Sequence, residues 1–458
     1  MLTSITINNF KSWKAVRDMR LAPFTGLFGT NSSGKTSLLQ LLLLLKQTVE
    51  SPDRAQVLNL GDERSLVALG TFRDVVYRHE QTSILHWSFS WCLPRELKVS
   101  DPERKGVTLF SGNEMRFEAT VKENGSGRVI VDEFAYIFAG QKFMLKRKSE
   151  NEEKYRLSPS PRSPSGFGFK RMQDRAWELP PPIKCYGFPD QVKAYFQNAG
   201  FLADFALAFE DLFSRVYYLG PLRDYPKREY TWAGAQPADM GQRGEKVVDA
   251  LLVSRQRGEK ISRGQGRKGF TAEEYVAWWL RELGLIHEFS VEPITKDSNL
   301  YRVWVQKVPN TARVLITDVG FGVSQILPVL VLCYYVPRGS IIILEQPEIH
   351  LHPSVQAGLA DVFIDAIQTR NIQILLESHS EHLLRRLQRR VAEEKISNED
   401  AAFYFCDIVG GTSELKPLDL DIFGNITNWP RNFFGDDFGE MAATTRAAIL
   451  RKRQQPQG

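Results

Sequence analysis

The hydrophobic residues of this chain alternate with polar ones at the start and then gather into short unbroken runs. Residues 2–10 (LTSITINNF) alternate as in a half-buried strand, and residues 24–28 (FTGLF) predict a buried strand. Residues 37–46 (SLLQLLLLLK) are apolar on most sides and predict a buried helix. Two later runs, residues 340–344 (SIIIL) and 372–376 (IQILL), predict strands buried on both faces of a parallel sheet. These patterns predict an α/β fold.

The middle of the chain contains two segments of loop-like composition. Residues 146–175 are charged and rich in Ser and Pro, which predicts a mobile loop. Residues 255–269 (RQRGEKISRGQGRKG) are basic and rich in Gly, and we interpret them either as a solvated linker or as a loop that contacts phosphates. Between the two segments, residues 216–220 (VYYLG) predict a short strand that is followed by the sequence PLR.

Composition is that of a globular protein and excludes few functions. The 458 residues favour two or three structural units, and 43% hydrophobic with 25% charged residues is ordinary for a folded chain. A formal net charge of +5 is compatible with nucleic acid and does not require it. The four cysteines are far apart in sequence, which argues against a zinc site or a disulfide framework and favours the reducing cytoplasm. No apolar run is long enough to cross a bilayer, so we expect no membrane association.

An eight-residue motif lies between the strand predicted at 24–28 and the helix predicted at 37–46. The sequence GTNSSGKT fits the phosphate-binding loop (P-loop) G-x-x-x-x-G-K-[ST] at every position. Lys35 is therefore expected to bind the β- and γ-phosphates of a nucleoside triphosphate, and Thr36 to ligate Mg²⁺. The alternative is a chance match in a loop rich in Gly and Ser. The predicted nucleotide-binding residues of this loop are Gly29, Thr30, Asn31, Ser32, Ser33, Gly34, Lys35, Thr36 and Ser37.

Acidic residues follow the strand predicted at 340–344. The sequence there is Glu345-Gln346-Pro347-Glu348. Because open α/β sheets bind ligands at the carboxyl ends of their strands, we predict a Walker B element in which Glu345 holds Mg²⁺ directly or through water. A solvated acidic turn is the alternative.

The strand predicted at 372–376 is followed by Glu377-Ser378-His379-Ser380, and histidines gather near both of these strand ends. Four of the seven histidines lie there, namely His350, His352, His379 and His382. Metal binding by these histidines is an open alternative, although no spacing here resembles a catalytic zinc motif.

Small and polar residues precede the apolar run at 326–336. Gly320, Gly322, Ser324 and Gln325 stand at the predicted start of a helix, and a helix N-terminus suits an anion. Because the chain already has a P-loop for its own nucleotide, we predict that this second site binds the γ-phosphate held by another copy of the chain. Association of the two copies would then depend on ATP.

The order of these motifs resembles that of ABC-type ATPases of the RecF, structural-maintenance-of-chromosomes (SMC) and OLD group. The resemblance rests on the segments NNFKSW, GTNSSGKT, DVGFGVSQ (signature), IIILEQPEIHLHP (Walker B and D-loop) and LLESHS (switch histidine). It implies an ATPase head whose mixed or parallel sheet is assembled from both chain ends, with a central α+β insertion and no long coiled coil. It also implies ATP and Mg²⁺ as cofactors, and a homodimer in which two heads enclose two ATP molecules, with a larger homo-oligomer left open.

The resemblance assigns roles position by position. Thr36 and Glu345 bind Mg²⁺, and His379 senses the γ-phosphate. The residues that cover the nucleotide of the second copy are Gly320, Gly322, Ser324 and Gln325, whereas Lys11 contacts the phosphates of its own copy.

This chain departs from the family pattern at two places. Gln346 replaces the glutamate that polarises the attacking water, and Gly320-Phe321-Gly322 replaces serine-glycine-glycine in the signature. An amide cannot accept a proton, so either Glu348 or Glu345 substitutes as the base or hydrolysis is slow.

Residues 419–450 resemble the small C-terminal module of a bacterial subgroup of these ATPases, many of whose members are suspected to act in defence against phage. Together with Gln346, which favours slow hydrolysis, we take this to indicate an ATPase that serves as a sensor or scaffold and controls a separately encoded effector, for which a nuclease is one candidate. The alternative is an ATPase of RecF/SMC type that handles DNA or RNA, which the basic helix predicted at 382–390 favours. We expect no nuclease activity of the chain itself.

We expect five segments along the chain. They are the N-terminal part of the ATPase head (1–80), an inserted lobe (81–215), a connecting segment that leads to the signature (216–312), the C-terminal part of the head (313–415) and a small C-terminal module (416–458).

Overall fold

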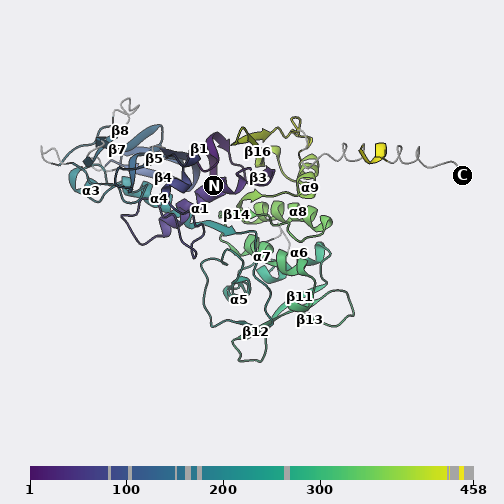
Figure 1. Cartoon of the computed structure of the whole chain (residues 1–458). Helices are drawn as coiled ribbons and strands as arrows, with labels where there is room; N and C mark the ends of the chain where they lie inside the picture. The colour runs from purple at the N-terminus through teal and green to yellow at the C-terminus, as the bar shows by residue number, and fades with distance from the viewer. Residues whose placement is uncertain are drawn as a thin grey trace.

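The computed structural model describes most of the chain, and the structural statements below concern these residues alone. They are residues 1–80, 84–101, 106–149, 152–159, 167–172, 178–262, 269–430, 433 and 443–447. In this part of the chain, three sheets and the helices packed on them form the fold (Figure 1).

A six-stranded sheet lies at the centre of the molecule. Its order is β17-β16-β3-β15-β14-β9, and the strands run parallel except for β17 at one edge. The bounds are β3 Phe24–Gly29, β9 Val216–Leu219, β14 Ile341–Glu345, β15 Gln373–Glu377, β16 Ala401–Val409 and β17 Thr412–Leu418. The predicted α/β fold, with a mixed sheet drawn from both ends of the chain, is confirmed.

Helices cover both faces of this sheet because its strands are apolar on both sides. Ile341 and Ile343 of β14 belong to a core shared with α1, whereas Ile342 and Leu344 belong to a second core shared with α7, α8 and α9. This alternation follows from the two-residue period of a strand. The bounds of these helices are α1 Lys35–Glu50, α7 Phe321–Tyr335, α8 Pro353–Arg370 and α9 Glu381–Ala392. The longest described helix, α8, has 18 residues, so the described part of the chain contains no long coiled-coil arm.

An antiparallel sheet of seven strands extends to one side of the central sheet, in the order β2-β1-β4-β5-β6-β7-β8. Its strands are β1 Leu2–Phe10, β2 Trp13–Arg20, β4 Leu85–Ser100, β5 Thr108–Glu123, β6 Val129–Phe138, β7 Gln141–Ser149 and β8 Glu152–Pro159. Short helices accompany it at α2 Phe72–Val75, η1 Tyr77–His79, α3 Gln191–Tyr195 and α4 Leu202–Ser214. Because β1 pairs with β4, the hydrogen-bonded sheet runs across the segment boundary that we predicted at residue 80.

The predicted loop at 146–175 is wrong for its first part, because β7 and β8 form a hairpin there. Leu145, Tyr155 and Leu157 are buried in this hairpin, while charged residues occupy the solvent side. The alternation of buried and exposed residues in these strands was not recognised, because the strands are highly charged and a stretch rich in Ser and Pro follows them. Residues 150–151, 160–166 and 173–177 lie outside the described residues.

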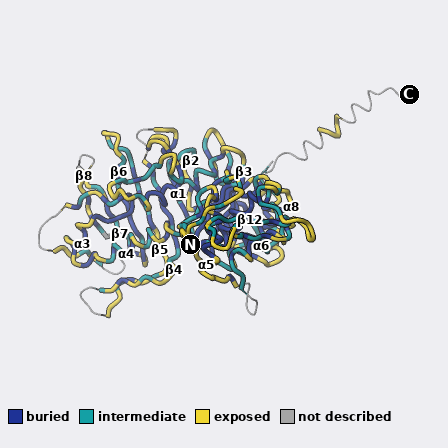
Figure 2. Tube along the Cα trace, turned by 90° about the horizontal axis from the view of Figure 1, so that it is seen from below, coloured by how far each residue is buried: buried dark blue, intermediate teal, exposed yellow. Residues whose placement is uncertain are grey.

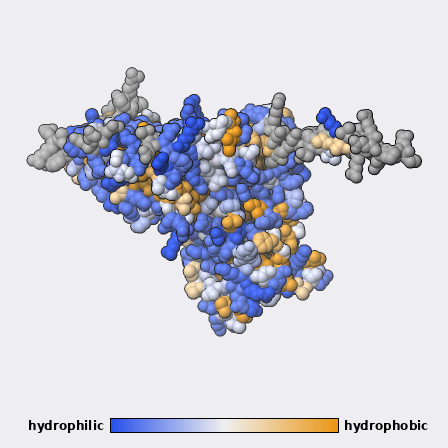
Figure 3. All heavy atoms as spheres, in the orientation of Figure 1, coloured by the Kyte–Doolittle hydropathy of each residue, from blue (hydrophilic) through white to orange (hydrophobic). Residues whose placement is uncertain are grey.

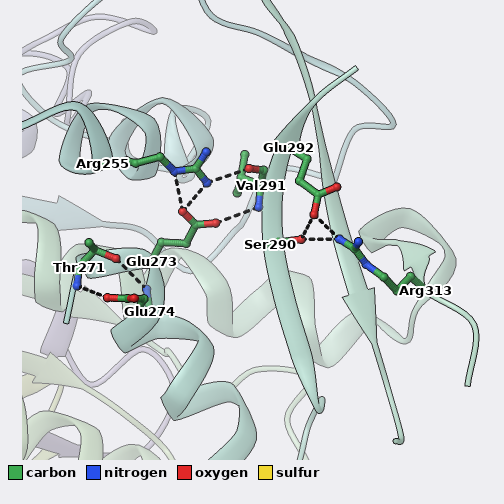
Figure 4. Close-up of polar contacts among 8 residues, drawn as sticks. All are labelled: Arg255, Thr271, Glu273, Glu274, Ser290, Val291, Glu292 and Arg313. Atoms are coloured by element: carbon green, nitrogen blue, oxygen red, sulfur yellow. Dashed lines mark hydrogen bonds and ion pairs between the residues drawn. The ribbon is translucent and has the colours of Figure 1, made fainter. Parts of the chain in front are cut away.

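A third unit of a small sheet and two helices lies below the central sheet in Figure 1. It consists of β10 Tyr230–Thr231, β11 Glu288–Pro293, β12 Leu300–Gln306, β13 Val314–Leu315, α5 Val247–Arg257 and α6 Ala272–Glu282. Figure 4 shows how polar contacts join its parts: Arg255 of α5 binds Glu273 of α6, and Arg313 binds Glu292 of β11. The predicted linker or loop at 255–269 is therefore wrong at its start, because Arg255 lies in the last turn of α5 and forms an ion pair. Residues 263–268 lie outside the described part.

Burial follows this layered arrangement. The buried residues concentrate in the strands and in the helices packed on them (Figure 2), and hydrophilic residues cover most of the face shown in Figure 3. Two 3-10 helices complete the described elements, η2 Ile316–Asp318 and η3 Asn398–Asp400. In the described part of the chain, we find no helix whose length and apolar character would let it span a membrane.

Candidate nucleotide-binding site

The P-loop joins the end of β3 to the start of α1, as the sequence predicts. Gly29 and Gly34 have φ angles of 134° and 91°, which disfavour other residues. A Cβ at Gly29 would lie 2.0 Å from the carbonyl oxygen of Cys406, and a Cβ at Gly34 would lie 2.6 Å from Oγ of Ser12. The loop is thus packed from behind by the Cys406 backbone at Gly29 and by the Ser12 side chain at Gly34, which leaves its front for a ligand.

The N-terminus of α1 is open towards this front. Gly34 is its N-cap and supplies no side-chain cap, so the first N–H groups of the helix are available to an anion. Lys35 is buried, and its Nζ donates to the carbonyl oxygens of Gly29 at 3.2 Å and Thr30 at 2.6 Å. Burial lowers the pKa of Lys35. Asn31 and Ser32 are exposed, whereas Ser33 is buried and donates to the Thr30 carbonyl at 2.8 Å.

Two buried carboxylates stand side by side at the carboxyl edge of the sheet. Glu345 ends β14 and Glu377 ends β15, and the parallel register pairs them directly. Oγ1 of Thr36 donates to Oε2 of Glu377 at 2.7 Å, and the hydroxyl of Tyr218 on β9 donates to Oε1 of Glu345 at 3.0 Å. The structure thereby brings Thr36, from the P-loop helix, to this acidic pair.

Glu377 and Tyr218 were not among the predicted site residues. Glu377 follows the run IQILL as Glu345 follows SIIIL, and two adjacent parallel strands of equal length place such residues together. The shared pattern, a glutamate directly after an apolar run, could have identified Glu377. Tyr218 gave no signal, because its role depends on β9 lying beside β14.

The turn after Glu345 holds the other predicted residues of this edge. Gln346 has a φ of 45°, and its N–H donates to the Glu377 carbonyl at 2.8 Å. Glu348 is buried, its Oε1 accepts from the N–H of His379 at 2.6 Å, and its Oε2 is buried without a partner. His379 is an exposed residue. Partial burial of its imidazole, and secondly the positive charge of Lys35, lower the pKa of this ring.

The residues at the start of α7 contact the turn after Glu348. Gly320 is the N-cap of α7, and the ring of Phe321 lies 5.7 Å from that of His350. Oγ of Ser324 donates back to the Phe321 carbonyl at 2.8 Å. Gly322 and Gln325, which are also predicted ligands, lie in the first two turns of α7.

Lys11 lies beside α1, where its Nζ donates to Oε1 of Gln40 at 2.5 Å. Burial lowers the pKa of Lys11. The contact places this ammonium next to the P-loop helix, and no contact with the loop itself is formed in the described structure.

Two protein families match parts of this chain. Residues 1–154 and 278–384, which are more than half of the chain, match the family described as AAA ATPase domain. The chain belongs to the AAA ATPase domain family. Residues 396–443 of this AAA ATPase match a second family, described only as Protein of unknown function (DUF3696). A search of curated proteins gave no match.

Solved structures of SMC heads are similar to this AAA ATPase over most of its length. The SMC head domain from Thermotoga maritima is 10% identical, with a TM-score of 0.41, and covers 91% of this chain and 99% of its own. The Smc head domain with an extended coiled coil, bound to the C-terminal domain of ScpA and derived from Pyrococcus furiosus, is 9% identical, with a TM-score of 0.45 and coverage of 98% and 99%.

The residues of the site fit ATP and Mg²⁺, which an ATPase domain implies. The glycines of the P-loop stand where a Cβ would clash with the backing structure, and the buried Oε2 of Glu348 lacks a partner. Thr36, Glu345 and Glu377 offer oxygen atoms, which Mg²⁺ prefers and which phosphates and water supplement. Among the described residues, no group of three or more His, Cys, Asp or Glu side chains is arranged to hold a metal ion, so the histidine metal site gains no support.

Two carboxyl groups of the AAA ATPase site, those of Glu345 and Glu348, have raised pKa values. Burial raises the pKa of Glu345 to about 7, the neighbouring Glu377 adds to this, and Tyr218 and Arg223 oppose it. Burial likewise raises the pKa of Glu348. A cation bound at this edge would therefore stabilise the ionised forms.

The stability of the nucleotide-free protein is expected to contain a term from Glu345 that falls as the pH rises. Its folded pKa of about 7 exceeds the ordinary value of 4.5, so the folded state binds the proton more tightly, and this stabilisation is complete below 4.5 and lost as the pH passes 7. We expect the melting temperature of wild type, relative to Glu345→Gln, to fall between pH 5 and pH 7.5. The exposed Glu282→Gln is the matched control. A difference that stays constant with pH would contradict this.

Proposed function

We propose that this AAA ATPase binds ATP with Mg²⁺ at its P-loop, hydrolyses it slowly, and forms a homodimer that encloses two ATP molecules. The observation that supports slow hydrolysis best is the acidic edge of the sheet. Gln346 occupies the place next to Glu345, and its backbone is held by the Glu377 carbonyl, so an amide stands where a proton acceptor would be needed.

The proposed roles of the side chains follow from their positions. Lys35 and the N–H groups of the P-loop bind the phosphates, Thr36 and Glu345 hold Mg²⁺, and the metal, when bound, neutralises charge on the phosphates. Gln346 orients water through its amide. Glu348 is the proposed base, because its unpartnered Oε2 is available and its raised pKa strengthens it as a proton acceptor.

The N-terminus of α7 is the proposed contact with the second copy. Gly320, Gly322, Ser324 and Gln325 lie there, and the exposed apolar surface beside them supports coverage by another protein. Phe321 is 46% exposed and Tyr225 is 72% exposed, and their rings contact each other at 5.7 Å. His379, which follows β15 next to the P-loop strand β3, is proposed to sense the γ-phosphate.

ATP with Mg²⁺ is expected to double the molar mass of the protein in light scattering after size-exclusion chromatography, whereas ADP leaves it monomeric. Phe321→Asp should prevent the doubling without abolishing ATP binding, because it places a charge in the proposed interface. Leu207→Asp is the matched control, since Leu207 is 55% exposed on the remote helix α4. A mass that is the same in ATP and ADP would refute the dimer.

The dimer is further proposed to act as a sensor or scaffold in bacterial anti-phage defence and to control a separately encoded effector. Slow hydrolysis supports this, because a long-lived ATP-bound dimer can hold an effector in one state, whereas a protein that performs repeated mechanical steps needs rapid turnover. The same chromatography, with the product of the neighbouring gene added, tests it: co-elution that depends on the nucleotide is expected, and its absence in every nucleotide state would count against the effector.

The alternative is a DNA-binding ATPase, which we suggested from the basic helix α9. Each arginine of this helix is paired with a carboxylate, so nucleic acid would compete with these ion pairs for the arginines. The pairs are Arg385 with Glu381, Arg386 with Asp361, Arg389 with Glu393, and Arg390 with Asp361 and Glu393.

A further inference from the structure

Arg223 is a half-buried arginine near the nucleotide site, and two buried nitrogen atoms of its guanidinium lack hydrogen-bond partners. It follows β9, whose last residue, Leu219, pairs with Leu344 of β14 directly before Glu345. Nε and Nη1 of Arg223 are buried, and neither has a partner in the described structure. Since a guanidinium always carries its charge and five N–H donors, its burial in this form is costly.

The surroundings of Arg223 are those of the acidic edge. The groups that act on its charge are Tyr218, Glu345 and Glu348, and burial outweighs them and lowers its pKa to about 10. None of these groups forms an ion pair or hydrogen bond with it in the described residues. The arginine thus stands close to the carboxylates that we assign to Mg²⁺ and to the base without being neutralised by them.

We propose that Arg223 binds the terminal phosphate of the ATP held by the P-loop of the same chain. This proposal rests on the proposed function and adds a residue to it. A guanidinium matches phosphate oxygens with parallel donors, and an arginine supplied within the same chain is a known means of stabilising charge on a transferred phosphoryl group. A ligand phosphate would supply the partners that Nε and Nη1 lack.

The segment after Arg223 connects this arginine to the proposed dimer face. Tyr225 contacts Phe321 at the start of α7, and Arg228 forms an ion pair with Asp318 at 2.9 Å. Binding of Arg223 to a terminal phosphate would therefore fix the segment 223–228, which contacts the start of α7. ATP would fix this segment, whereas ADP, which lacks the terminal phosphate, would not.

The test compares Arg223→Met with the exposed control Lys227→Met in the full chain. We expect Arg223→Met to weaken binding of a non-hydrolysable ATP analogue by about 10- to 100-fold and to leave binding of ADP unchanged, because a hydrogen bond to a charged group is lost. Lys227→Met should bind both nucleotides as wild type does. Arg223→Lys should recover binding in part, since it restores the charge without the planar donors.

A second readout is the melting temperature without nucleotide. Removal of an unpartnered buried charge should leave it unchanged or raise it, whereas loss of a structural arginine would lower it. The proposal is overturned if the analogue binds Arg223→Met as tightly as wild type, if ATP and ADP affinities fall together, or if the nucleotide-free protein is destabilised. The phosphate that Arg223 binds could be the terminal phosphate of ATP or free inorganic phosphate. Tighter binding of ADP in the presence of inorganic phosphate would show that Arg223 binds the released product as well. If wild type binds no ATP, the proposed function itself fails.

Discussion

Lys35→Ala is expected to weaken ATP binding by roughly 100-fold or more. The ammonium is buried at the mouth of the P-loop, where its hydrogen-bond partners among the described residues are the carbonyl oxygens of Gly29 and Thr30. Two charge-assisted hydrogen bonds to phosphate contribute about 3 kcal/mol or more, and each 1.4 kcal/mol is a factor of ten in affinity. Titration with a fluorescent ATP analogue measures the loss.

Lys14→Ala is the matched control for Lys35→Ala, because Lys14 is exposed on β2 and should bind the analogue normally. Unchanged circular dichroism and melting temperature would show that Lys35→Ala is folded. Wild-type affinity in a folded Lys35→Ala would contradict the assignment of the P-loop as the nucleotide site.

Gln346→Glu is expected to accelerate ATP hydrolysis by about 100-fold or more, because it supplies a carboxylate as proton acceptor at the position directly after Glu345. General-base catalysis contributes roughly 10² to 10⁴ in rate. The faster enzyme should also spend less time as the ATP-bound dimer, which phosphate release and light scattering can follow together. Rapid hydrolysis by wild type, with no change on substitution of Gln346, would refute a slow ATPase.

Glu348→Gln provides the complementary variant. Its amide oxygen can still accept from the His379 N–H, so the turn is expected to remain in place, while the residual rate falls because the proposed base is gone. The exposed Gln191→Glu on α3 is the control for the negative charge that Gln346→Glu adds.

Local patterns allowed the strands, turns and helices around the candidate site to be predicted. The P-loop, the strands that end at Glu345 and Glu377, and the helix that starts near Gly320 each depend on residues close together in sequence. The roles assigned to these residues remain predictions. The partners of Thr36 and Glu345 could not be predicted, because Glu377 and Tyr218 meet them only through the order of strands in the sheet.

Long-range pairing is also what the sequence could not show elsewhere. β1 pairs with β4, and the two strands are separated by a long stretch of chain whose sequence does not indicate the pairing. The arginines of α9 suggested a nucleic-acid surface because sequence shows charge and not its partner, and Asp361, which pairs with Arg386 and Arg390, lies on α8.

The position of β3 in the sheet has a consequence for synthesis of the protein. β3 lies between β15 and β16, and Gly29 packs against Cys406, so the P-loop cannot be completed until residues near 406 have been made. At 5–20 residues per second, translation needs roughly 20 to 70 s to pass from the P-loop to these strands. Throughout that interval the nascent chain exposes an apolar strand and cannot yet bind ATP tightly, which makes it a natural client for chaperones at the ribosome.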